Sequence, residues 1–436
     1  MKIHKLTKKL VFKVLDNKYI IRFLVKIKLN YVLYFFGLLL IKSVNTNSIN
    51  EKKKYNFLCL DRPIFNEDID SLASASNEFK FIKIPKEYFL FLIKALCTYK
   101  AFAHQSYYSK SLDSKSYKVY KKTILYIIKK IIRKFDIKGI LTGNYNYSWQ
   151  QEIALFCSTE KEIKFVIILK EGLNILGVEG EDNLISTVKC FKRFTNNRFI
   201  GDMLFVYNDL IKDALIKSNI KGISQEKIIV SGIPRMDKYY NLPVTHKKEI
   251  TFFSFSIEDK TNHLNLNAGD FNKTKILSDK YHLDIIKFAI LNKEYKLTIK
   301  TKANKKYIDE IRKLIRRNKL QITSNIHITN KGQAYDLIKN SSLIIGFNSV
   351  TLQESLAAER KVICCDFRKT KIKDQFEGYE NIVYYFDNYE KLEKLIKTKN
   401  IKNISSSNKK KYLEKTLGNT SGSASKKILK ELKEKI

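Results

Sequence analysis

The chain of 436 residues lacks the cysteine and histidine spacings that hold structural metals. None of its six cysteines belongs to a Cys-x-x-Cys pair, and no cysteine and histidine have the spacing of a zinc site. Most of the cysteines stand within apolar runs, where a free thiol behaves as a small buried hydrophobe. We therefore expect reduced thiols, a cytoplasmic location and no structural metal.

Sequence motifs that mark several large enzyme classes are also missing. The chain contains no Gly-x-Gly-x-x-Gly, no Gly-x-x-x-x-Gly-Lys-Ser/Thr, no Gly-x-Ser-x-Gly and no His-Glu-x-x-His. These absences disfavour Rossmann-type dehydrogenases, P-loop phosphoryl transfer and zinc proteolysis. The segment Asp68-Ile69-Asp70 looks like a metal-binding Asp-x-Asp motif, but an acidic first turn of a helix explains it better. The sequence therefore predicts no metal site.

No apolar run near the N-terminus reaches the length of a membrane-spanning helix. The uncharged run Tyr31–Ile41, between Lys28 and Lys42, has about half of the roughly 20 residues that such a helix needs. Residues 1–30 alternate apolar and basic side chains, and no small-residue cleavage site of a signal peptide follows. We expect either an amphipathic segment on an anionic membrane surface, or an ordinary first helix and strand packed into the core.

Acidic residues are few compared with basic ones. Lysine and arginine total 82 against 44 acidic residues, which gives a formal net charge of +38. Such an excess favours polyanionic partners, namely nucleic acid, anionic lipid or phosphate-bearing substrates. Because the lysines are spread along the whole chain and no nucleic-acid-binding motif is present, we do not expect nucleic acid as a partner.

From residue 55 onward, strand and helix patterns alternate. This alternation predicts right-handed βαβ units, parallel sheets and an α/β fold. A polar break without periodicity at Asn241–Glu249 divides the pattern into two halves, and Asp259–Asp279 is expected to be a long loop. The predicted parts are a basic N-terminal segment 1–54, a first α/β domain 55–245, a second α/β domain 246–408 and C-terminal helices 409–436.

One segment of the second domain has the pattern of a phosphate-binding turn. Leu343–Gly346 is an apolar strand, a short polar loop follows, and Ser349–Ala358 is helical. Asn348 or Ser349 can cap this helix, so that its first N–H groups point at the loop and suit a diphosphate. A carboxylate at Glu354 can accept both hydroxyls of a ribose.

This segment resembles the nucleotide-sugar motif of GT-B glycosyltransferases. Lys227–Asp237, Gly201–Asn208 and Leu417–Ile428 are similar to segments of CDP-glycerol glycerophosphotransferase-like proteins and related surface-carbohydrate or O-antigen enzymes. The resemblance covers roughly residues 55–436. It implies a GT-B fold, in which two Rossmann-like domains with parallel sheets face each other across a cleft and C-terminal helices cross back.

The resemblance also implies an activity and its partners. The expected reaction is metal-independent glycosyl transfer without a cofactor, from a nucleotide-sugar donor to a lipid-linked or polysaccharide acceptor. The basic N-terminus and the net charge make an anionic membrane surface a further candidate partner, which would place the enzyme at the inner face of the plasma membrane. The alternatives are a nucleotide-sugar 2-epimerase, a polyol-phosphate transferase, a nucleic-acid-binding protein and a scaffold without catalysis.

The residues that match the family's motifs fall into three groups. The first group binds the donor, the second neutralises the leaving diphosphate, and the third belongs to the segment between the domains. There Arg235 pairs either with phosphate or with an acidic side chain such as Asp237. The groups are Gly346, Asn348, Ser349, Thr351 and Glu354; Lys300 and Lys302; and Gly232, Pro234 and Arg235.

A catalytic base is harder to identify from the sequence. Inverting transfer needs a group that deprotonates the acceptor hydroxyl. In the glycerophosphotransferase relatives a His-Gly pair ends a strand of the first domain, whereas here the strand Phe165–Leu169 is followed by Lys170-Glu171-Gly172. Glu171 is therefore the first candidate base, and Asp61 and Glu152 are weaker ones. The loss of the histidine favours sugar transfer over polyol-phosphate transfer.

Overall fold

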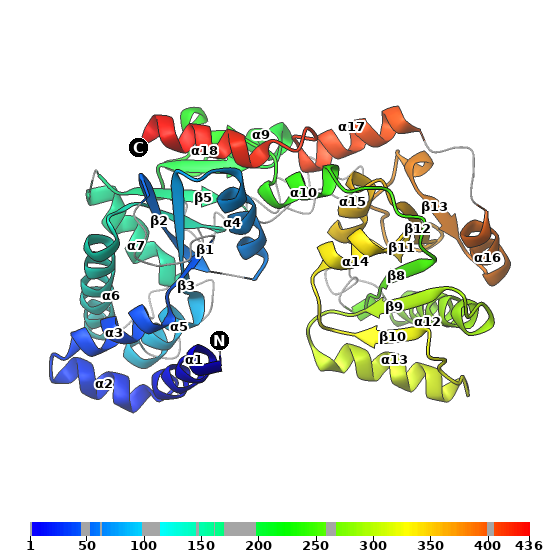
Figure 1. Cartoon of the computed structure of the whole chain (residues 1–436), viewed down its shortest axis with the longest axis horizontal. Helices are drawn as coiled ribbons and strands as arrows, with labels where there is room; N and C mark the ends of the chain where they lie inside the picture. Colours follow the sequence, from blue (N-terminus) through cyan, green and yellow to red (C-terminus); the bar gives the residue numbers. More distant parts are fainter. Residues whose placement is uncertain are drawn as a thin grey trace. The chain divides into compact units, whose positions relative to one another are not determined.

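The computed structural model describes residues 2–44, 53–61, 63–97, 114–144, 148–160, 162–169, 198–258, 267–398 and 405–436. The chain forms two structural units (Figure 1), and each is described by itself. Unit 1 holds the described residues up to Asp237 together with Thr416–Ile436. Unit 2 holds the described residues of Lys238–Lys415.

Unit 1 is built on a seven-stranded sheet with the order β1-β3-β2-β4-β5-β6-β7. Only the short edge strand β1 is antiparallel to its neighbour, and the other strands pair in parallel. The strands are β1 (Lys42–Val44), β2 (Tyr55–Asp61), β3 (Phe79–Pro85), β4 (Ile137–Thr142), β5 (Lys164–Ile168), β6 (Met203–Val206) and β7 (Ile228–Val230).

Helices cover the sheet of unit 1. Apolar side chains of α4 and of the C-terminal helix α18 share one core cluster with strand residues such as Phe57, Phe81 and Val166. Helices α5, α6 and α7 contact strands β3, β4 and β5. The helices are α1 (Lys2–Leu15), α2 (Lys18–Lys26), α3 (Asn30–Leu40), α4 (Pro63–Ala75), α5 (Lys86–Leu96), α6 (Ser114–Phe135), α7 (Ser148–Thr159), α9 (Asp209–Lys217), α18 (Ala424–Lys435), and the 3-10 helices η3 (Gln225–Lys227) and η4 (Pro234–Met236).

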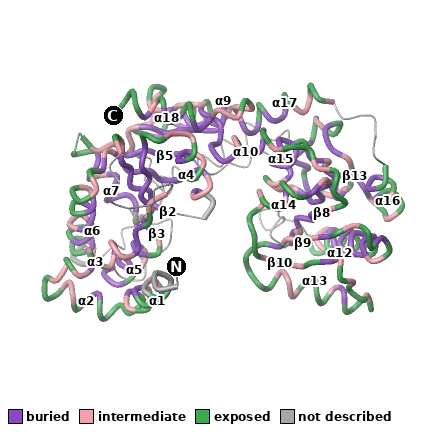
Figure 2. The backbone as a smooth tube through the Cα atoms, viewed as in Figure 1, coloured by how far each residue is buried: buried purple, intermediate pink, exposed green. Residues whose placement is uncertain are grey.

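Unit 2 is built on a six-stranded, fully parallel sheet with the order β10-β9-β8-β11-β12-β13. Strands β8, β11 and β12 are largely buried, whereas β9 and β10 also have exposed or half-buried residues (Figure 2). The strands are β8 (Glu249–Phe253), β9 (Lys296–Lys300), β10 (Ile326–Thr329), β11 (Leu343–Gly346), β12 (Lys361–Cys365) and β13 (Tyr384–Phe386). The helices are α10 (Asp237–Tyr240), α12 (Ala268–Leu291), α13 (Lys305–Arg317), α14 (Ala334–Asn340), α15 (Val350–Ala357), η5 (Glu380–Ile382), α16 (Tyr389–Lys397) and α17 (Ser406–Leu417). The first residue of α10 and the last two residues of α17 belong to unit 1.

The predicted α/β class with mainly parallel sheets is confirmed, but three local predictions are wrong. Residues 268–279, expected in a loop, form the first half of α12, where Asn267 accepts a hydrogen bond from the Asp270 N–H and so caps the helix. The run at 31–41, expected as a strand if packed in the core, is helix α3. Asp68 and Asp70 do not lie in a first turn, because α4 begins at Pro63. The sequence patterns also left out β1, β3, β13 and α16.

The order of strands in each parallel sheet fixes where a ligand can bind. A crevice opens at the carboxyl ends of two neighbouring strands whose connections run to opposite sides. In unit 2 this switch point lies between β8 and β11, because β8 leads to β9 on one side and β11 leads to β12 on the other. In unit 1 it lies between β2 and β4 for the same reason.

Two glycines allow the C-terminal segment to approach the strand ends of unit 1 closely. Gly232 and Gly418 both have φ of +80°, in the left-handed region that favours glycine. A Cβ atom at Gly418 would lie 1.8 Å from the Tyr207 carbonyl oxygen, and one at Gly232 would lie 2.7 Å from the Asn419 Cβ. The backbone at both positions therefore has no room for a side chain.

We predict that Gly418→Ala lowers the free energy of unfolding of unit 1 by about 3 kcal/mol, because the methyl group overlaps a backbone carbonyl. Urea unfolding followed by tryptophan fluorescence measures this, since the single tryptophan, Trp149, stands in α7 of unit 1. The control is Gly332→Ala in unit 2, whose Cβ would meet no atom within 4 Å and which has a φ of +91°.

The control variant should lower the free energy of unfolding of unit 2 by about 1 kcal/mol, because of backbone strain alone. Circular dichroism during the same urea titration measures this. The variant should leave the fluorescence transition in place. A Gly418→Ala variant that unfolds at the urea concentration of the wild type would contradict this close approach.

Candidate functional site

The side chain of Asn348 holds the loop after β11 at the switch point of unit 2, and the backbone of this residue has an unusual conformation. Asn348 has a φ of +40°. Its Oδ1 accepts a hydrogen bond from the Gln375 N–H at 3.0 Å, and its Nδ2 donates to the Lys373 carbonyl at 2.6 Å. The loop after β12 thus fixes the loop after β11, and the turn between Gly346 and α15 has a defined shape.

Of the two residues that the sequence offers as caps, Asn348 and Ser349, it is Ser349 that caps helix α15. Its Oγ accepts from the Thr351 N–H at 3.3 Å and lies 2.8 Å from the Thr351 Oγ1. The Gln375 Nε2 donates to the Ser349 carbonyl at 3.3 Å. Two hydroxyls therefore stand together at the N-terminus of α15, where the helix dipole favours negative charge.

Glu354 lies farther along the same helix and is only 7% exposed. The Tyr239 hydroxyl donates a hydrogen bond to its Oε2 at 3.3 Å. The Tyr239 ring in turn meets the edge of Tyr335, with ring centroids 5.3 Å apart, and the Lys238 Nζ lies 4.2 Å from the Tyr335 centroid. The carboxylate thus has a fixed partner, and an aromatic pair stands beside it.

The two candidate lysines after β9 have different surroundings. The Lys300 Nζ donates to the carbonyls of Thr301 at 2.7 Å and Asn330 at 3.2 Å, and burial lowers the pKa of this amine. Lys302 has an exposed side chain that lines a cavity of about 260 Å³. Of the two amines, only that of Lys302 opens to this cavity.

The cavity lies at the carboxyl ends of β8 and β9, between helices α12 and α13. Its wall includes the loop after β8, where the Phe255 ring packs on Phe347 of the loop after β11 at 5.4 Å. The contact between Phe255 and Phe347 therefore links the wall of the cavity to the turn that contains Asn348 and Ser349. Charged side chains of both signs line it, namely Glu258, Lys275, Asp279, Lys302, Glu310, Lys313 and Arg317.

His282 of α12 forms the buried end of this cavity. Its Nδ1 lies 2.8 Å from the Ser278 carbonyl oxygen, which only accepts, so Nδ1 carries the proton. Nε2 then accepts from the Ser254 hydroxyl at 3.0 Å. Burial, also against the rings of Phe252 and Phe255, lowers the pKa of the imidazole and keeps it neutral.

In unit 1, Arg235 is engaged by an acidic side chain. Its Nη1 lies 3.1 Å from Oδ2 and 3.2 Å from Oδ1 of Asp68, and its backbone N–H donates to the same carboxylate. The Tyr207 hydroxyl accepts from Nη2 at 3.3 Å. Burial raises the pKa of Asp68 although the guanidinium opposes this, so the pair is desolvated on both sides.

The acidic motif that resembles a metal site has other partners in the described structure. Asp68 pairs with Arg235, and Asp70 lies 2.6 Å from the Lys83 Nζ. Among the residues that the structure describes, no group of three histidine, cysteine or acidic side chains is placed to hold a metal ion. Asp237, the other acid considered for Arg235, accepts from the N–H groups of Ala424 and Ser425 at 2.9 and 2.8 Å.

Of the three candidate bases, the structure describes the side chain of Glu152 alone. Glu171 lies outside the described residues, and so does the side chain of Asp61 at the end of β2. Glu152 is buried in α7, where it accepts from the Tyr117 hydroxyl and lies 3.2 Å from the Lys121 Nζ. Glu152 is thus held within unit 1 by two partners from α6.

The predicted donor residues from Gly346 to Glu354 lie on one strand end, turn and helix, and the structure adds neighbours that the sequence analysis did not select. Tyr239, Gln375 and the pair of Ser254 and His282 contact or flank the same turns. No local pattern marks them, because each meets its partner through the folding of distant segments. Gly232 and Arg235 lie in the other unit and support the turn before α10.

Comparison with known proteins gives similarity at the level of structure alone. No family model matches the chain, and no curated protein matches its sequence. A solved structure described as a UDP-N-acetylglucosamine 2-epimerase from Listeria monocytogenes has a TM-score of 0.51 and 14% identity over 88% of this chain and 96% of that one.

Two further structures are similar at lower scores. The UDP-GlcNAc 2-epimerase from Neisseria meningitidis bound to UDP-GlcNAc has a TM-score of 0.45 and 15% identity, over 87% of this chain and 99% of that one. The wall teichoic acid polymerase TagF has a TM-score of 0.47 and 13% identity, over 100% and 99%. At this identity the likeness shows the fold, and the chain has the α/β fold of the GT-B enzymes with two Rossmann-like sheets.

We predict that unit 2 loses stability as the pH falls below about 6.5, partly through His282. The unfolded chain takes up a proton there that the buried neutral imidazole does not, so each pH unit costs up to about 1.4 kcal/mol until the lower folded-state pKa is reached. Urea unfolding at pH 7.5 and 5.5 should show a smaller loss for His282→Gln than for the wild type. His246→Gln, at an exposed histidine, is the control and should behave as the wild type; equal losses in all three would refute the assignment.

Proposed function

We propose that the chain is a glycosyltransferase that takes a sugar from a nucleotide donor and adds it to a surface polysaccharide or O-antigen acceptor. The observation that carries the proposal is the turn from Gly346 to α15, which lies at the switch point of the unit 2 sheet with its hydroxyls and a buried carboxylate in place. Ligands of open parallel sheets bind at such a point.

In this proposal, the donor's diphosphate lies at the N-terminus of α15. The Ser349 and Thr351 hydroxyls donate hydrogen bonds to it at the positive end of the helix dipole, and Asn348 fixes the shape of the turn. Lys302 supplies a positive charge as the diphosphate leaves. Lys300 shapes the end of β9 through its two carbonyl contacts.

The nucleotide's ribose is assigned to Glu354. Its carboxylate accepts the ribose hydroxyls, while the Tyr239 hydroxyl orients it from the side. Because hydrogen-bond donors and a lysine neutralise the diphosphate, the proposed reaction needs no metal or other cofactor. Glu171 is the proposed base for the acceptor hydroxyl, with the acceptor bound by unit 1.

The second candidate is a nucleotide-sugar 2-epimerase. One solved structure described as a UDP-N-acetylglucosamine 2-epimerase shares the fold, and such a reaction starts from the same donor contacts. The two candidates differ in one requirement, because a transferase needs an acceptor, whereas an epimerase changes the sugar nucleotide alone. Polyol-phosphate transfer stays less favoured, since Glu171 stands where a histidine is expected.

We predict that one nucleoside diphosphate out of a uridine, cytidine, guanosine and thymidine panel raises the melting temperature of the purified chain by several degrees. A ligand at about 100 times its dissociation constant stabilises the folded state by about 2.7 kcal/mol. Glu354→Gln should abolish the shift, and Glu359→Gln, at an exposed glutamate just beyond the same helix, should keep it. No shift with any diphosphate would count against the donor site.

We further predict that the sugar of the matching nucleotide-sugar stays unchanged until an acceptor is added. Incubation of the radiolabelled donor with extracted bacterial lipids should move the label into the lipid phase and release the nucleoside diphosphate. Chromatography of the same mixture without lipid separates C2 epimers. A new epimer in that control, with no label in lipid, would replace the transferase proposal by the epimerase.

A further inference from the structure

Each of the three N-terminal helices of unit 1 carries a pair of exposed apolar side chains on one face. These pairs are called the exposed rows. Leu6 and Leu10 on α1, Tyr19 and Phe23 on α2, and Tyr31 and Phe35 on α3 are each four residues apart and 54–73% exposed. Residues four apart lie on one face of a helix. Together with Ile20 and Ile27, these side chains make up half of the exposed large apolar side chains in the described part of the chain.

The exposed rows lie apart from the faces by which these helices pack on the rest of unit 1. Val11, Leu15, Ile21, Leu33 and Leu40 are almost completely buried on the inner faces. The Tyr88 hydroxyl of α5 donates to the Leu33 carbonyl at 2.7 Å, and a Cβ at Gly37 would lie 3.1 Å from the same hydroxyl. The packing of α3 on α5 therefore uses buried positions and does not use the exposed rows.

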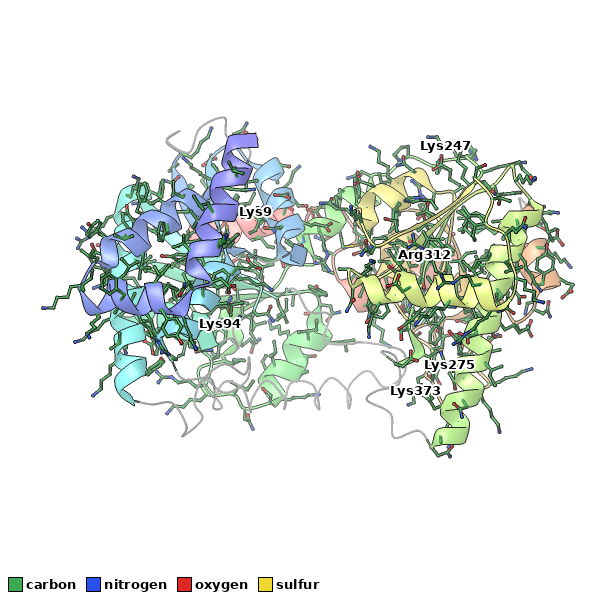
Figure 3. All side chains as sticks on the ribbon, turned by 90° about the horizontal axis from the view of Figure 1, so that it is seen from below. Lys9, Lys94, Lys247, Lys275, Arg312 and Lys373 are labelled. Atoms are coloured by element: carbon green, nitrogen blue, oxygen red, sulfur yellow. The ribbon has the colours of Figure 1, made fainter. Side chains whose placement is uncertain are left out.

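The charged residues of these helices and their connections are basic with one exception. Residues 2–44 contain ten lysines and arginines, while Asp16 is their only acidic residue. Exposed basic side chains such as Lys9, Lys13 and Lys26 alternate with the apolar rows along α1 and α2. Figure 3, in which α1 and α2 lie in front of unit 1, labels Lys9 on this side.

A groove lies next to the rows, between α2, the end of α5 and α6. It encloses about 500 Å³, and its lining is mainly apolar, with Val25, Leu96 and Val119 among its residues. Lys26 and Lys122 also line it. The Arg22 Nε donates to the Ala95 carbonyl at 2.6 Å and ties α2 to α5 at this groove. A groove with a mainly apolar lining and two lysines suits a phospholipid, which has acyl chains and a phosphate.

We propose that α1, α2 and α3 form a surface that docks this protein on an anionic lipid bilayer. Helices with apolar rows and lysine-rich polar faces lie in the interface of such membranes, and the binding combines apolar burial with electrostatic attraction. No described helix has the length and hydropathy to cross a membrane, and α3, at about 1.5 Å per residue, extends about 16 Å. The helices therefore lie on the bilayer rather than span it.

Charge complementarity selects a bilayer over a second copy of the chain. In a symmetric dimer through these helices, two surfaces that both expose Lys9, Lys13 and Lys26 would face one another, and like charges repel. An anionic bilayer supplies the opposite charge and an apolar interior at once. The inference does not depend on the identity of the donor or the acceptor.

The test is co-sedimentation of the full-length protein with vesicles of phosphatidylcholine alone or with 30% phosphatidylglycerol, at low and high salt. The wild type should pellet with the anionic vesicles at least tenfold more than with the neutral ones, and less at high salt. Leu10→Ser/Phe23→Ser should reduce this binding at least tenfold. Ile276→Ser/Leu291→Ser removes two apolar side chains of unit 2 that are 70% exposed, and should bind as the wild type.

A second pair of variants separates a local surface from the charge of the whole chain. Lys9→Glu/Lys26→Glu and Arg312→Glu/Arg316→Glu lower the net charge equally, and the second pair lies on the exposed face of α13 in unit 2. Only the first pair should weaken vesicle binding strongly. Circular dichroism and melting temperature confirm that each variant is folded.

Three results would overturn the proposal. One is equal binding of both charge-reversal variants, which would mean that total charge suffices. Another is wild-type protein that stays in the supernatant with anionic vesicles. The last is a dimer by light scattering that Leu10→Ser/Phe23→Ser converts to a monomer without any vesicle binding, since the rows would then cover a second copy. Loss of nucleotide binding in the Glu354→Gln variant leaves this test unaffected, so the two proposals fail separately.

Discussion

The core of unit 1 depends on a helix from the far end of the chain. Ile428, Leu429 and Leu432 of α18 belong to the same apolar cluster as the central strands and α4. The Asp237 carboxylate accepts hydrogen bonds from the first N–H groups of α18, and a carboxylate there also complements the helix dipole. Because α18 fills the core of unit 1, the chain must return there after completing unit 2.

This constraint gives a structural reason for two of the segments that resemble surface-carbohydrate enzymes. In Lys227–Asp237, Gly232 makes room for Asn419, Arg235 pairs with Asp68, and Asp237 caps α18. In Leu417–Ile428, Gly418 accommodates the Tyr207 carbonyl and Ile428 enters the core. The buried Arg235–Asp68 pair is costly to break, since removing one partner leaves a desolvated charge. These residues support the fold of unit 1, while the donor motif of unit 2 carries the proposed chemistry.

The two proposals place different chemistry on different elements of the chain. The donor site uses the carboxyl ends of strands in unit 2, where polar groups gather because the parallel strands all end at one edge. The lipid surface uses α1–α3, which need only one face each to pack on unit 1. A donor site on a sheet edge and a docking surface on outer helices can therefore function without sharing residues.

Local patterns in the sequence determined most strands and helices, the two-sheet α/β class and the turn from Gly346 to α15, because each rests on neighbours within a few residues. The same patterns missed the first half of α12, whose polar residues become helical through the cap at Asn267 and the packing of Phe271 and Leu277 on the core. Only the tertiary structure decided which side chains meet. Glu354 and Tyr239 are 115 residues apart, and Arg235 and Asp68 are 167 apart. Such partners are selected by burial, since a desolvated charge or hydroxyl needs a hydrogen-bond partner that the topology brings to it.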